Sequence, residues 1–379
     1  RAQLDRVAHS TLLGLANVPS IELARELVSI SPASLTRVFY SDSGSTAVEV
    51  AIKMAFQYWR QQGEEGRTRF ACLADAYHGD TIGSVSVGGI DLFHAMYRPL
   101  LFETVRIPSP YCYRCPIGMD RATCSMECAD QAANVIHEHA GELAALVMEP
   151  LVQGAAGMIV HPDGFLRRVA RACRDSGVLL ILDEVATGFG RTGRMFACDH
   201  EGVQPDIMAL AKGITGGYLP LAATLVADKV FDGFLGEFQS RRTFFHGHTY
   251  TGNPLACAAA LGNLEVFRRH RVLEHAAGLG RRLESSLSRF LEIEHVGDVR
   301  VRGTMAGIEL VRDAETKEPF DPALRVGHRV CMEARRHGAI LRPLGDVVVL
   351  MPPLAMDPDQ LDRLARITRE SIIAATEAS

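Results

Sequence analysis

The stretch of sequence that decides the fold is VLLILDEVATGFGRTG, residues 178–193. Residues 178–182 are apolar without alternation, which is typical of a strand covered on both faces of a sheet. Asp183 follows directly, at the position where open α/β sheets bind ligands beyond the carboxyl ends of their strands. The stretch therefore predicts a buried parallel strand that presents Asp183 to a site. The alternative is that Asp183 or Glu184 caps the turn that follows.

Similar apolar segments lie on both sides of this stretch and alternate with segments of helical periodicity. This alternation predicts an α/β fold with a largely parallel sheet between helices. From about residue 264 the pattern changes to long helical segments that flank a strand pattern. We therefore expect a large α/β domain over residues 1–264 and a smaller α+β domain over residues 265–379. The strands expected in the large domain are 38–40, 70–73, 143–148, 178–182, 207–210 and 221–226, and its helices are 46–62, 128–139 and 164–175.

The composition narrows the class of partner. The chain has 379 residues and a formal net charge of −5, which argues against nucleic acid as the main partner. No apolar run is long enough to span a membrane, and no signal peptide is visible. Nine cysteines, an odd number in a large chain, favour a reduced compartment over a disulfide framework. We expect a cytoplasmic protein whose partner is neither nucleic acid nor a membrane.

A second informative stretch, ALAKGITGGYLPLAATL at 209–225, places Lys212 among small and apolar residues. The glycines that follow allow the backbone to approach a ligand closely. An amine that loses its hydration there can act as a nucleophile toward carbonyl groups, as a Schiff-base lysine for pyridoxal phosphate does. That cofactor also needs a carboxylate at its ring nitrogen, and Asp183 supplies one. The alternative is a solvated lysine at the end of a strand.

A phosphate group needs donors, which the stretch SDSGSTAVEVAIKMA at 41–55 provides. It runs from a strand through Gly44 and Ser45 into a helix. Backbone N–H groups at a helix start form an anion site, to which a hydroxyl of Ser45 or Thr46 can add. The alternative is an ordinary serine cap on the helix.

Gly188, Gly190 and Gly193 form a G-x-G-x-x-G pattern after a strand, which raises a rival class of function. A dinucleotide site would require a helix that begins at this loop and an acidic residue about 20 positions further on. The residues that follow make a poor helix start. A nicotinamide-dependent oxidoreductase therefore remains the less favoured alternative.

Taken together, six motifs resemble the class III aminotransferases, which are pyridoxal-phosphate enzymes of fold type I. Within that class the chain is most similar to the branch that aminates 8-amino-7-oxononanoate to 7,8-diaminononanoate in biotin biosynthesis. The branch assignment rests on YHGDTIGSVSVG at 77–88, HTYTGNPLACAAA at 248–260 and LRPLGDVVVLMPPL at 341–354. The six motifs of the class are SDSGSTAVEVAIKMA, DAYHGDT, MEPLVQGAAGM, ILDEVATGFGRTG, LAKGITGG and HGHTYTGNPLACAAAL.

The resemblance implies roles for the cofactor-binding residues. Lys212 would bond covalently to pyridoxal phosphate and move the proton at the substrate carbon, and Asp183 would pair with the ring nitrogen. Gly44 and Ser45 would hold the phosphate. Tyr77 would stack on the ring and line the substrate pocket.

The resemblance also implies a homodimer with shared active sites. Thr249, with the backbone of His248, would reach the phosphate of the neighbouring subunit's cofactor. Gly247 would contact the substrate, and Arg342 would bind the substrate carboxylate, for which a guanidinium is well suited. Each position also has an ordinary alternative, such as a loop residue or a surface arginine.

Three questions stay open at this level. The amino donor is S-adenosylmethionine or lysine, since His248 stands where many users of S-adenosylmethionine carry proline. Another class III ω-aminotransferase, acting with pyruvate or 2-oxoglutarate, is the alternative function. The resemblance begins near residue 20 and leaves the family's aromatic N-terminal segment unmatched, so a remnant without activity is a further alternative.

The loop PYCYRCPIGMDRATCSMECAD at 110–130 carries Cys112, Cys115, Cys124 and Cys128 in a C-x2-C-x8-C-x3-C pattern. Four thiolates in such an arrangement can hold a structural zinc ion. The alternative is a loop whose reduced cysteines pack as small apolar residues. Because the family requires no metal, we expect none here.

Overall fold

The computed structural model describes residues 1–377, which form two compact units. The first unit comprises residues 1–151, 161–189 and 195–270, and the second comprises residues 152–160, 190–194 and the chain from Arg271 onward. The boundary expected after residue 264 would fall inside helix α8 (Pro254–Arg269). The units separate at the end of that helix instead.

The described part of the first unit is built on a seven-stranded sheet in the order β1-β9-β8-β7-β4-β2-β3. Neighbouring strands from β8 to β3 run parallel, as the apolar stretches predict, whereas β9 is antiparallel to both β8 and β1. The prediction of a mostly parallel α/β sheet is therefore confirmed. The strands are β1 (Leu35–Ser41), β2 (Arg69–Leu73), β3 (Thr104–Ile107), β4 (Leu143–Met148), β7 (Leu179–Asp183), β8 (Ile207–Leu210) and β9 (Ala222–Ala227).

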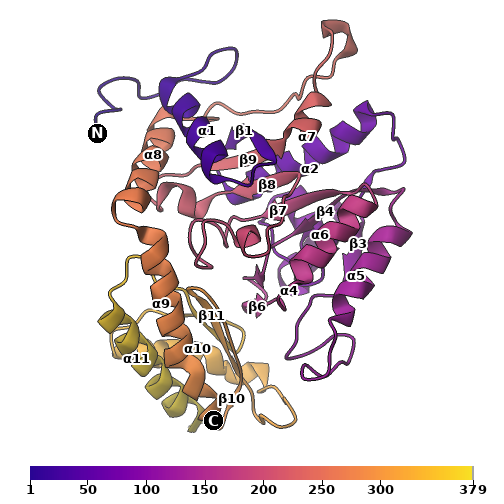
Figure 1. Ribbon diagram of the computed structural model, residues 1–379. Helices are drawn as coiled ribbons and strands as arrows, with labels where there is room; N and C mark the ends of the chain where they lie inside the picture. Colours follow the sequence, from indigo (N-terminus) through magenta and orange to yellow (C-terminus); the bar gives the residue numbers. More distant parts are fainter. Residues whose placement is uncertain (378–379) are drawn as a thin grey trace. The chain divides into compact units, whose positions relative to one another are not determined.

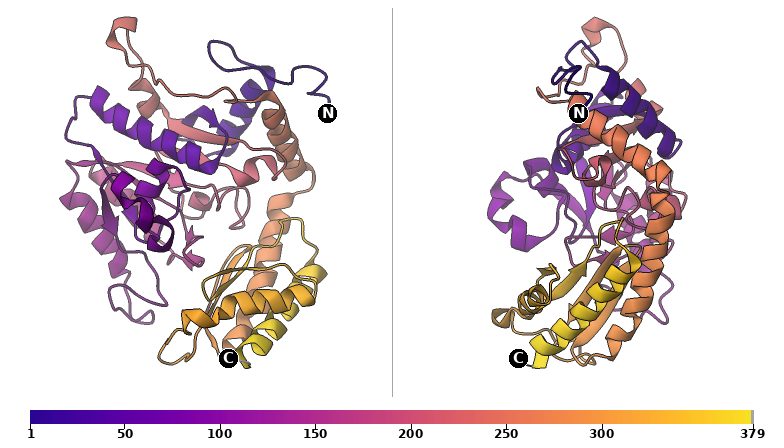
Figure 2. Two further views of the ribbon diagram at one scale, coloured as in Figure 1. Left: turned by 180° about the vertical axis from the view of Figure 1, so that it is seen from behind. Right: turned by 90° about the vertical axis from the view of Figure 1, so that its left-hand side faces the viewer.

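In this unit the helices pack against the sheet and against one another. Helix α2 (Gly44–Gln61) packs Ala51 and Met54 into a core that includes Ile181 of β7 and Ala209 of β8. Helices α5 (Glu127–Glu138) and α6 (Phe165–Asp175) lie side by side along the sheet (Figure 1). Helix α1 (Val18–Ile30) lies beside α8 in every view (Figures 1 and 2). The shorter helices are α3 (Ile82–Val87), α4 (Asp91–His94) and α7 (Asp228–Asp232).

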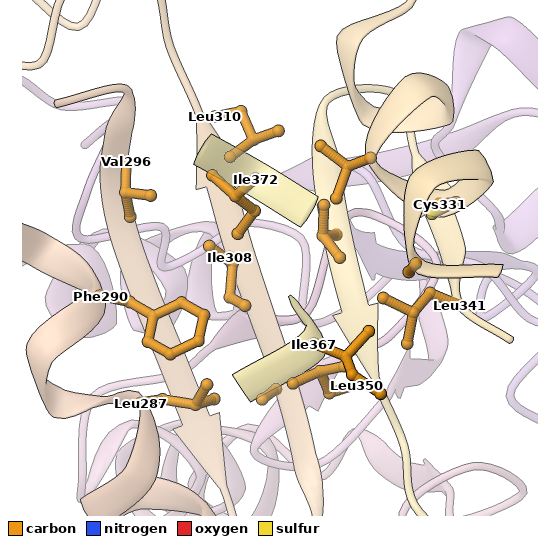
Figure 3. Close-up of a cluster of buried hydrophobic side chains, with 14 of the residues drawn as sticks. Leu287, Phe290, Val296, Ile308, Leu310, Cys331, Leu341, Leu350, Ile367 and Ile372 are labelled. Atoms are coloured by element: carbon orange, nitrogen blue, oxygen red, sulfur yellow. The ribbon is translucent and has the colours of Figure 1, made fainter. Parts of the chain in front are cut away.

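The second unit has an antiparallel four-stranded sheet in the order β10-β11-β13-β12. Figure 3 shows Phe290, Ile308 and Leu350 in one apolar layer with Ile367 and Ile372 of the last helix. The strands are β10 (Val296–Arg302), β11 (Met305–Leu310), β12 (Arg342–Leu344) and β13 (Val347–Leu350), and the helices are α9 (Val272–Leu287), α10 (Val326–Arg336) and α11 (Pro358–Glu377). A short hairpin, β5 (Val152–Gln153) and β6 (Ile159–Val160), belongs to the same unit. None of the helices described in either unit is long and apolar enough to cross a membrane.

A buried arginine joins that hairpin to the sheet of the second unit. Arg300 on β10 is 7% exposed and pairs with Asp298 at 2.8 Å and Glu309 at 2.6 Å. Its remaining donors reach the carbonyls of Gly157 at 2.7 Å and Met158 at 3.1 Å. The guanidinium therefore neutralises two carboxylates and satisfies the backbone of the β5–β6 turn.

We predict that Arg300→Met lowers the free energy of unfolding by about 3–5 kcal/mol, because it leaves the buried carboxylate of Glu309 and the half-buried carboxylate of Asp298 without a counter-charge. Denaturant unfolding of the purified chain measures this loss. Arg282→Met is the matched control, because its ion pair with Asp362 is exposed on both sides and is worth at most about 1 kcal/mol. Equal and small losses in the two variants would contradict the prediction.

Candidate active site

Three of the expected site residues lie at the ends of strands, or shortly after them, at the same edge of the sheet. Asp183 is the last residue of β7 and lies opposite Ala209 of the parallel strand β8. Ala209 is followed two residues later by Ala211, which leads into the turn that begins at Lys212. Strand β1 runs parallel to β8, since β9 is antiparallel to both, and it leads into Gly44 at the start of α2. The topology of the first unit therefore brings the starts of these three loops together.

The start of α2 has the features of an anion site. Ser43 caps the helix, and the first backbone N–H groups, at Gly44 and Ser45, have no carbonyl within the helix to bind. A Cβ atom on Gly44 would lie 2.6 Å from Val185 Cγ1, so only glycine lets the segment after Asp183 approach the helix. The hydroxyl of Ser45 accepts a hydrogen bond from the backbone N–H of Thr81 at 3.0 Å.

Asp183 is held by a histidine that the sequence analysis did not single out. The carboxylate is 4% exposed, and its Oδ2 atom lies 2.7 Å from Nδ1 of the buried His78. Its Oδ1 atom accepts the backbone N–H of Val185 at 3.0 Å. The only signal in the sequence was the position of His78 directly after Tyr77. This pair of contacts fixes the direction in which the carboxylate can receive a further donor.

Tyr77 lies half-buried in the loop after β2. Its backbone N–H donates to Oε2 of Glu149 at 3.2 Å, and its hydroxyl donates to Asp80 at 2.9 Å. The ring of His94 stacks on the Tyr77 ring, with an interplanar angle of 11°. The position of Tyr77 is therefore defined by contacts at its backbone, its hydroxyl and its ring.

Lys212 lies at the expected place, but its surroundings differ from the expectation. The Lys212 side chain is exposed to solvent, whereas Ala211 and Ile214 occupy the buried positions of the turn. Its backbone adopts φ +44°, a left-handed conformation that few residues other than glycine adopt. The expected loss of hydration was therefore wrong for the chain by itself.

Gly247, His248 and Thr249 lie in the loop that precedes α8, also in the first unit. Gly247 and Thr249 are exposed, and the His248 ring accepts a hydrogen bond from the backbone N–H of Tyr250 at 3.1 Å. Nε2 of His248 lies 3.7 Å from the carboxylate of Asp42, two residues before α2. The loop is therefore close to the segment that leads into the anion site.

Arg342 belongs to the second unit and not to the first. It is the first residue of β12 in the second unit, is exposed, and pairs in register with Val349. Its expected role toward a substrate carboxylate stays a prediction.

The glycine-rich loop after β7 has no helix between residues 184 and 196, although a dinucleotide site requires one to begin there. A fully buried carboxyl group holds the loop instead. Thr187 donates its hydroxyl to Oε2 of Glu184 at 2.5 Å, and the backbone N–H of Cys198 donates to Oε1 at 2.9 Å. Burial raises the pKa of Glu184 from its ordinary value of 4.5 to about 7, even though these hydrogen bonds oppose the shift.

This raised pKa predicts a pH-dependent stability. The folded chain binds the Glu184 proton more tightly than the unfolded chain, so the resulting stabilisation is present below pH 4.5 and is lost as the pH rises toward 7. The variant Glu184→Gln cannot lose this proton. We predict that wild type loses on the order of 2–3 kcal/mol relative to Glu184→Gln between about pH 5 and pH 8. Denaturant unfolding of both proteins at each pH tests this, and a constant difference would contradict it.

The four cysteines of the loop at 110–130 are free thiols. Burial and the neighbouring thiols of Cys124 and Cys112 raise the pKa of Cys128 to about 11. Cys124 accepts the backbone N–H of Met126 at 3.2 Å. Among residues 1–377 no three histidine, cysteine or acidic side chains are grouped in a way that could hold a metal ion.

Comparison with known proteins gives a consistent picture. The family model described as aminotransferase class-III matches residues 1–372, further toward the N-terminus than the expected start near residue 20. The adenosylmethionine-8-amino-7-oxononanoate aminotransferase of Nitratidesulfovibrio vulgaris is 59% identical over 379 residues, which cover 100% of this chain and 70% of that protein.

Two solved structures are also similar. The crystal structure of the enzyme with the same name from Methanocaldococcus jannaschii has a TM-score of 0.92 and 47% identity, over 98% of this chain and 83% of that chain. An amine transaminase from an uncultivated Pseudomonas species, solved in its PLP-bound form, has a TM-score of 0.93 and 40% identity, over 100% of this chain and 85% of that chain.

Proposed function

Because the chain belongs to the class III aminotransferases, we propose that it aminates the keto carbon of 8-amino-7-oxononanoate to give 7,8-diaminononanoate. The amino donor in this proposal is S-adenosylmethionine, with lysine as the alternative donor. The observation that carries the proposal is the 59% identity, over the whole chain, to a relative named for this reaction. The product is the diamine used in biotin biosynthesis.

The residues at the sheet edge fit pyridoxal phosphate. The start of α2 offers unpaired backbone N–H groups at Gly44 and Ser45 for a phosphate, and Asp183 offers a buried carboxylate for a protonated ring nitrogen. Lys212 presents a primary amine at the same edge. When bound, the cofactor supplies an electrophilic carbon and a ring that accepts electrons from the substrate carbon.

We assign the proton-binding and proton-transfer roles to two residues of the chain. Asp183, oriented by Nδ1 of His78 and by the N–H of Val185, holds the proton on the ring nitrogen. Lys212 uses its Nζ atom to remove the proton from the amine-bearing carbon of the donor, and later returns a proton to the keto carbon of the acceptor. Donor and acceptor bind in turn at the same site, so ping-pong kinetics follow.

Three further residues are assigned to substrate binding. Tyr77, whose hydroxyl and ring are positioned by Asp80 and His94, would cover one face of the cofactor and line the pocket. Gly247 leaves room for the substrate chain. Arg342 binds the substrate carboxylate through a bidentate guanidinium contact.

We further propose a cytoplasmic homodimer with shared active sites, in which Thr249 and the backbone of His248 bind the phosphate held by the partner subunit. In support, Thr249 is exposed, and the neighbouring Phe245 and Tyr250 are 78% and 62% exposed. Large exposed aromatic side chains of this kind are enriched at protein interfaces. All nine cysteines are free thiols, in keeping with a reduced compartment.

A second candidate function is that of an ω-aminotransferase acting with pyruvate or 2-oxoglutarate. The amine transaminase structure favours it, because its TM-score to this chain, 0.93, is as high as the TM-score of 0.92 for the M. jannaschii enzyme. The two candidates share the cofactor site and differ in substrate, so a substrate test separates them.

Complementation of a strain that requires 7,8-diaminononanoate tests the acceptor directly. Growth with the wild-type chain, and none with Lys212→Met, is the expected result. A panel of purified donors and acceptors then identifies the donor. Fast turnover of an amine with pyruvate, together with no turnover of 8-amino-7-oxononanoate, would overturn the proposal in favour of the second candidate.

A further inference from the structure

Lys212 is held in a backbone conformation that is unfavourable for a lysine. A φ of +44° brings the Cβ atom of an L-residue close to its own backbone, and such a conformation persists only where the surroundings enforce it. Local contacts are few: the turn η3 (Lys212–Thr215) has backbone bonds from Ile214 to Ala211 at 3.1 Å and from Gly216 to Gly213 at 3.1 Å. The constraint must therefore come in part from other segments.

One such constraint comes from helix α8. The side-chain amide of Asn263 donates to the carbonyl of Gly213 at 2.8 Å and to the carbonyl of Ile214 at 3.2 Å. An amide NH₂ group has two N–H donors, so a single side chain satisfies both carbonyls of the turn. These two carbonyls belong to the residues directly after Lys212, so Asn263 fixes the path of the chain at that point.

A second constraint comes from the loop after β7. A Cβ atom on Gly213 would lie 2.7 Å from Phe189 Cβ, so the phenylalanine packs directly against the backbone of the turn. Phe189 is 2% exposed and meets the ring of Phe196 edge-on at 5.7 Å. The turn thus has a buried apolar contact at Gly213 and polar contacts at the carbonyls of Gly213 and Ile214.

We propose that Asn263 is a positioning residue for Lys212: its amide holds the turn in the conformation that presents the lysine amine at the sheet edge. This inference rests on the proposed function of Lys212. Asn263 is assigned no contact with cofactor or substrate, and it acts only through the backbone of Gly213 and Ile214. Without its two hydrogen bonds the turn relaxes toward ordinary conformations, and the amine is presented correctly for only part of the time.

The first test uses the 379-residue chain without cofactor and measures amide hydrogen exchange in peptides that cover the turn. Asn263→Ala removes the donor, and Asn263→Asp keeps the shape but turns a carboxylate toward two carbonyl oxygens. Exchange at the turn is expected to accelerate about tenfold or more in both variants, from the loss of two hydrogen bonds. Arg268→Ala is the matched control, because it removes the ion pair of the same helix with Glu26 and does not touch the turn. Its turn is expected to exchange at the wild-type rate.

The second test measures how fast pyridoxal phosphate becomes attached to Lys212, by borohydride quenching at timed intervals followed by peptide mass spectrometry. The rate of attachment is expected to fall about tenfold in both Asn263 variants and to stay unchanged in Arg268→Ala. Wild-type exchange at the turn and a wild-type attachment rate in Asn263→Ala and Asn263→Asp would overturn the inference. A wild-type chain that is never labelled at Lys212 would contradict the proposed function instead, and the exchange rates would still confirm or overturn the hold of Asn263 on the turn.

Discussion

Lys212→Met lowers kcat for transamination by about a thousandfold or more while the chain stays folded, because methionine has no amine to bond to a carbonyl or to move a proton. The loss in stability is expected to be small, since the Lys212 side chain is exposed and makes none of the contacts that hold the turn. Single-turnover kinetics with each substrate and thermal unfolding of the variant measure the two effects separately.

Lys229→Met is the matched control for this variant. Lys229 is also exposed on the first unit and pairs with Asp206, away from the carboxyl edge of the sheet. Its removal is expected to leave kcat within about twofold of wild type, as for most surface changes. A Lys212→Met enzyme that keeps more than a tenth of the wild-type kcat would contradict the assignment of the lysine.

Asp183→Asn is expected to lower kcat by about a hundredfold or more, the size of effect seen when a preorganised electrostatic group is removed from an active site. A neutral amide cannot hold a proton on the ring nitrogen, and its NH₂ group competes for the site that now faces Nδ1 of His78. The ring would then accept electrons poorly, whereas the start of α2, which we propose holds the phosphate, is unchanged. Measured kcat should therefore fall far more than the affinity for the cofactor.

The neighbouring variant Glu184→Gln controls for the replacement of a buried acid by its amide in the same segment. Glu184 is equally buried, but its carboxyl group contacts Thr187 and Cys198 rather than His78. Its amide variant is expected to keep kcat within a few-fold of wild type at neutral pH. An equal loss of kcat in both variants would indicate that the segment tolerates no substitution. It would contradict the specific role that we assign to Asp183.

The strands were predictable wherever burial on both faces leaves an uninterrupted apolar run. Leu143–Met148 and Ile207–Leu210 form β4 and β8 with the expected bounds for this reason. The antiparallel direction of β9 was not predictable, because its residues are equally apolar in either direction. Helix α2 begins at Gly44, two residues before the expected start, because Ser43 rather than a later residue is the cap.

The placement of Asp183 and Lys212 followed from one rule, since parallel strands end at a common edge. His78 and Asn263 could not be found in this way. Their contacts join residues 105 and 50 positions apart, and neither lies in a periodic pattern that indicates its partner. The exposure of Lys212 was missed because the apolar residues around it fill the buried positions of the turn themselves.

The most direct test of the account is to find the residue to which the cofactor bonds. The purified chain is incubated with pyridoxal phosphate, reduced with borohydride and digested, and the peptides are mapped by mass spectrometry. The account predicts one reduced pyridoxyl group per chain, located on Lys212, and none in Lys212→Met. A label on another lysine, such as Lys53 or Lys229, or an active enzyme with no label at all, would contradict it.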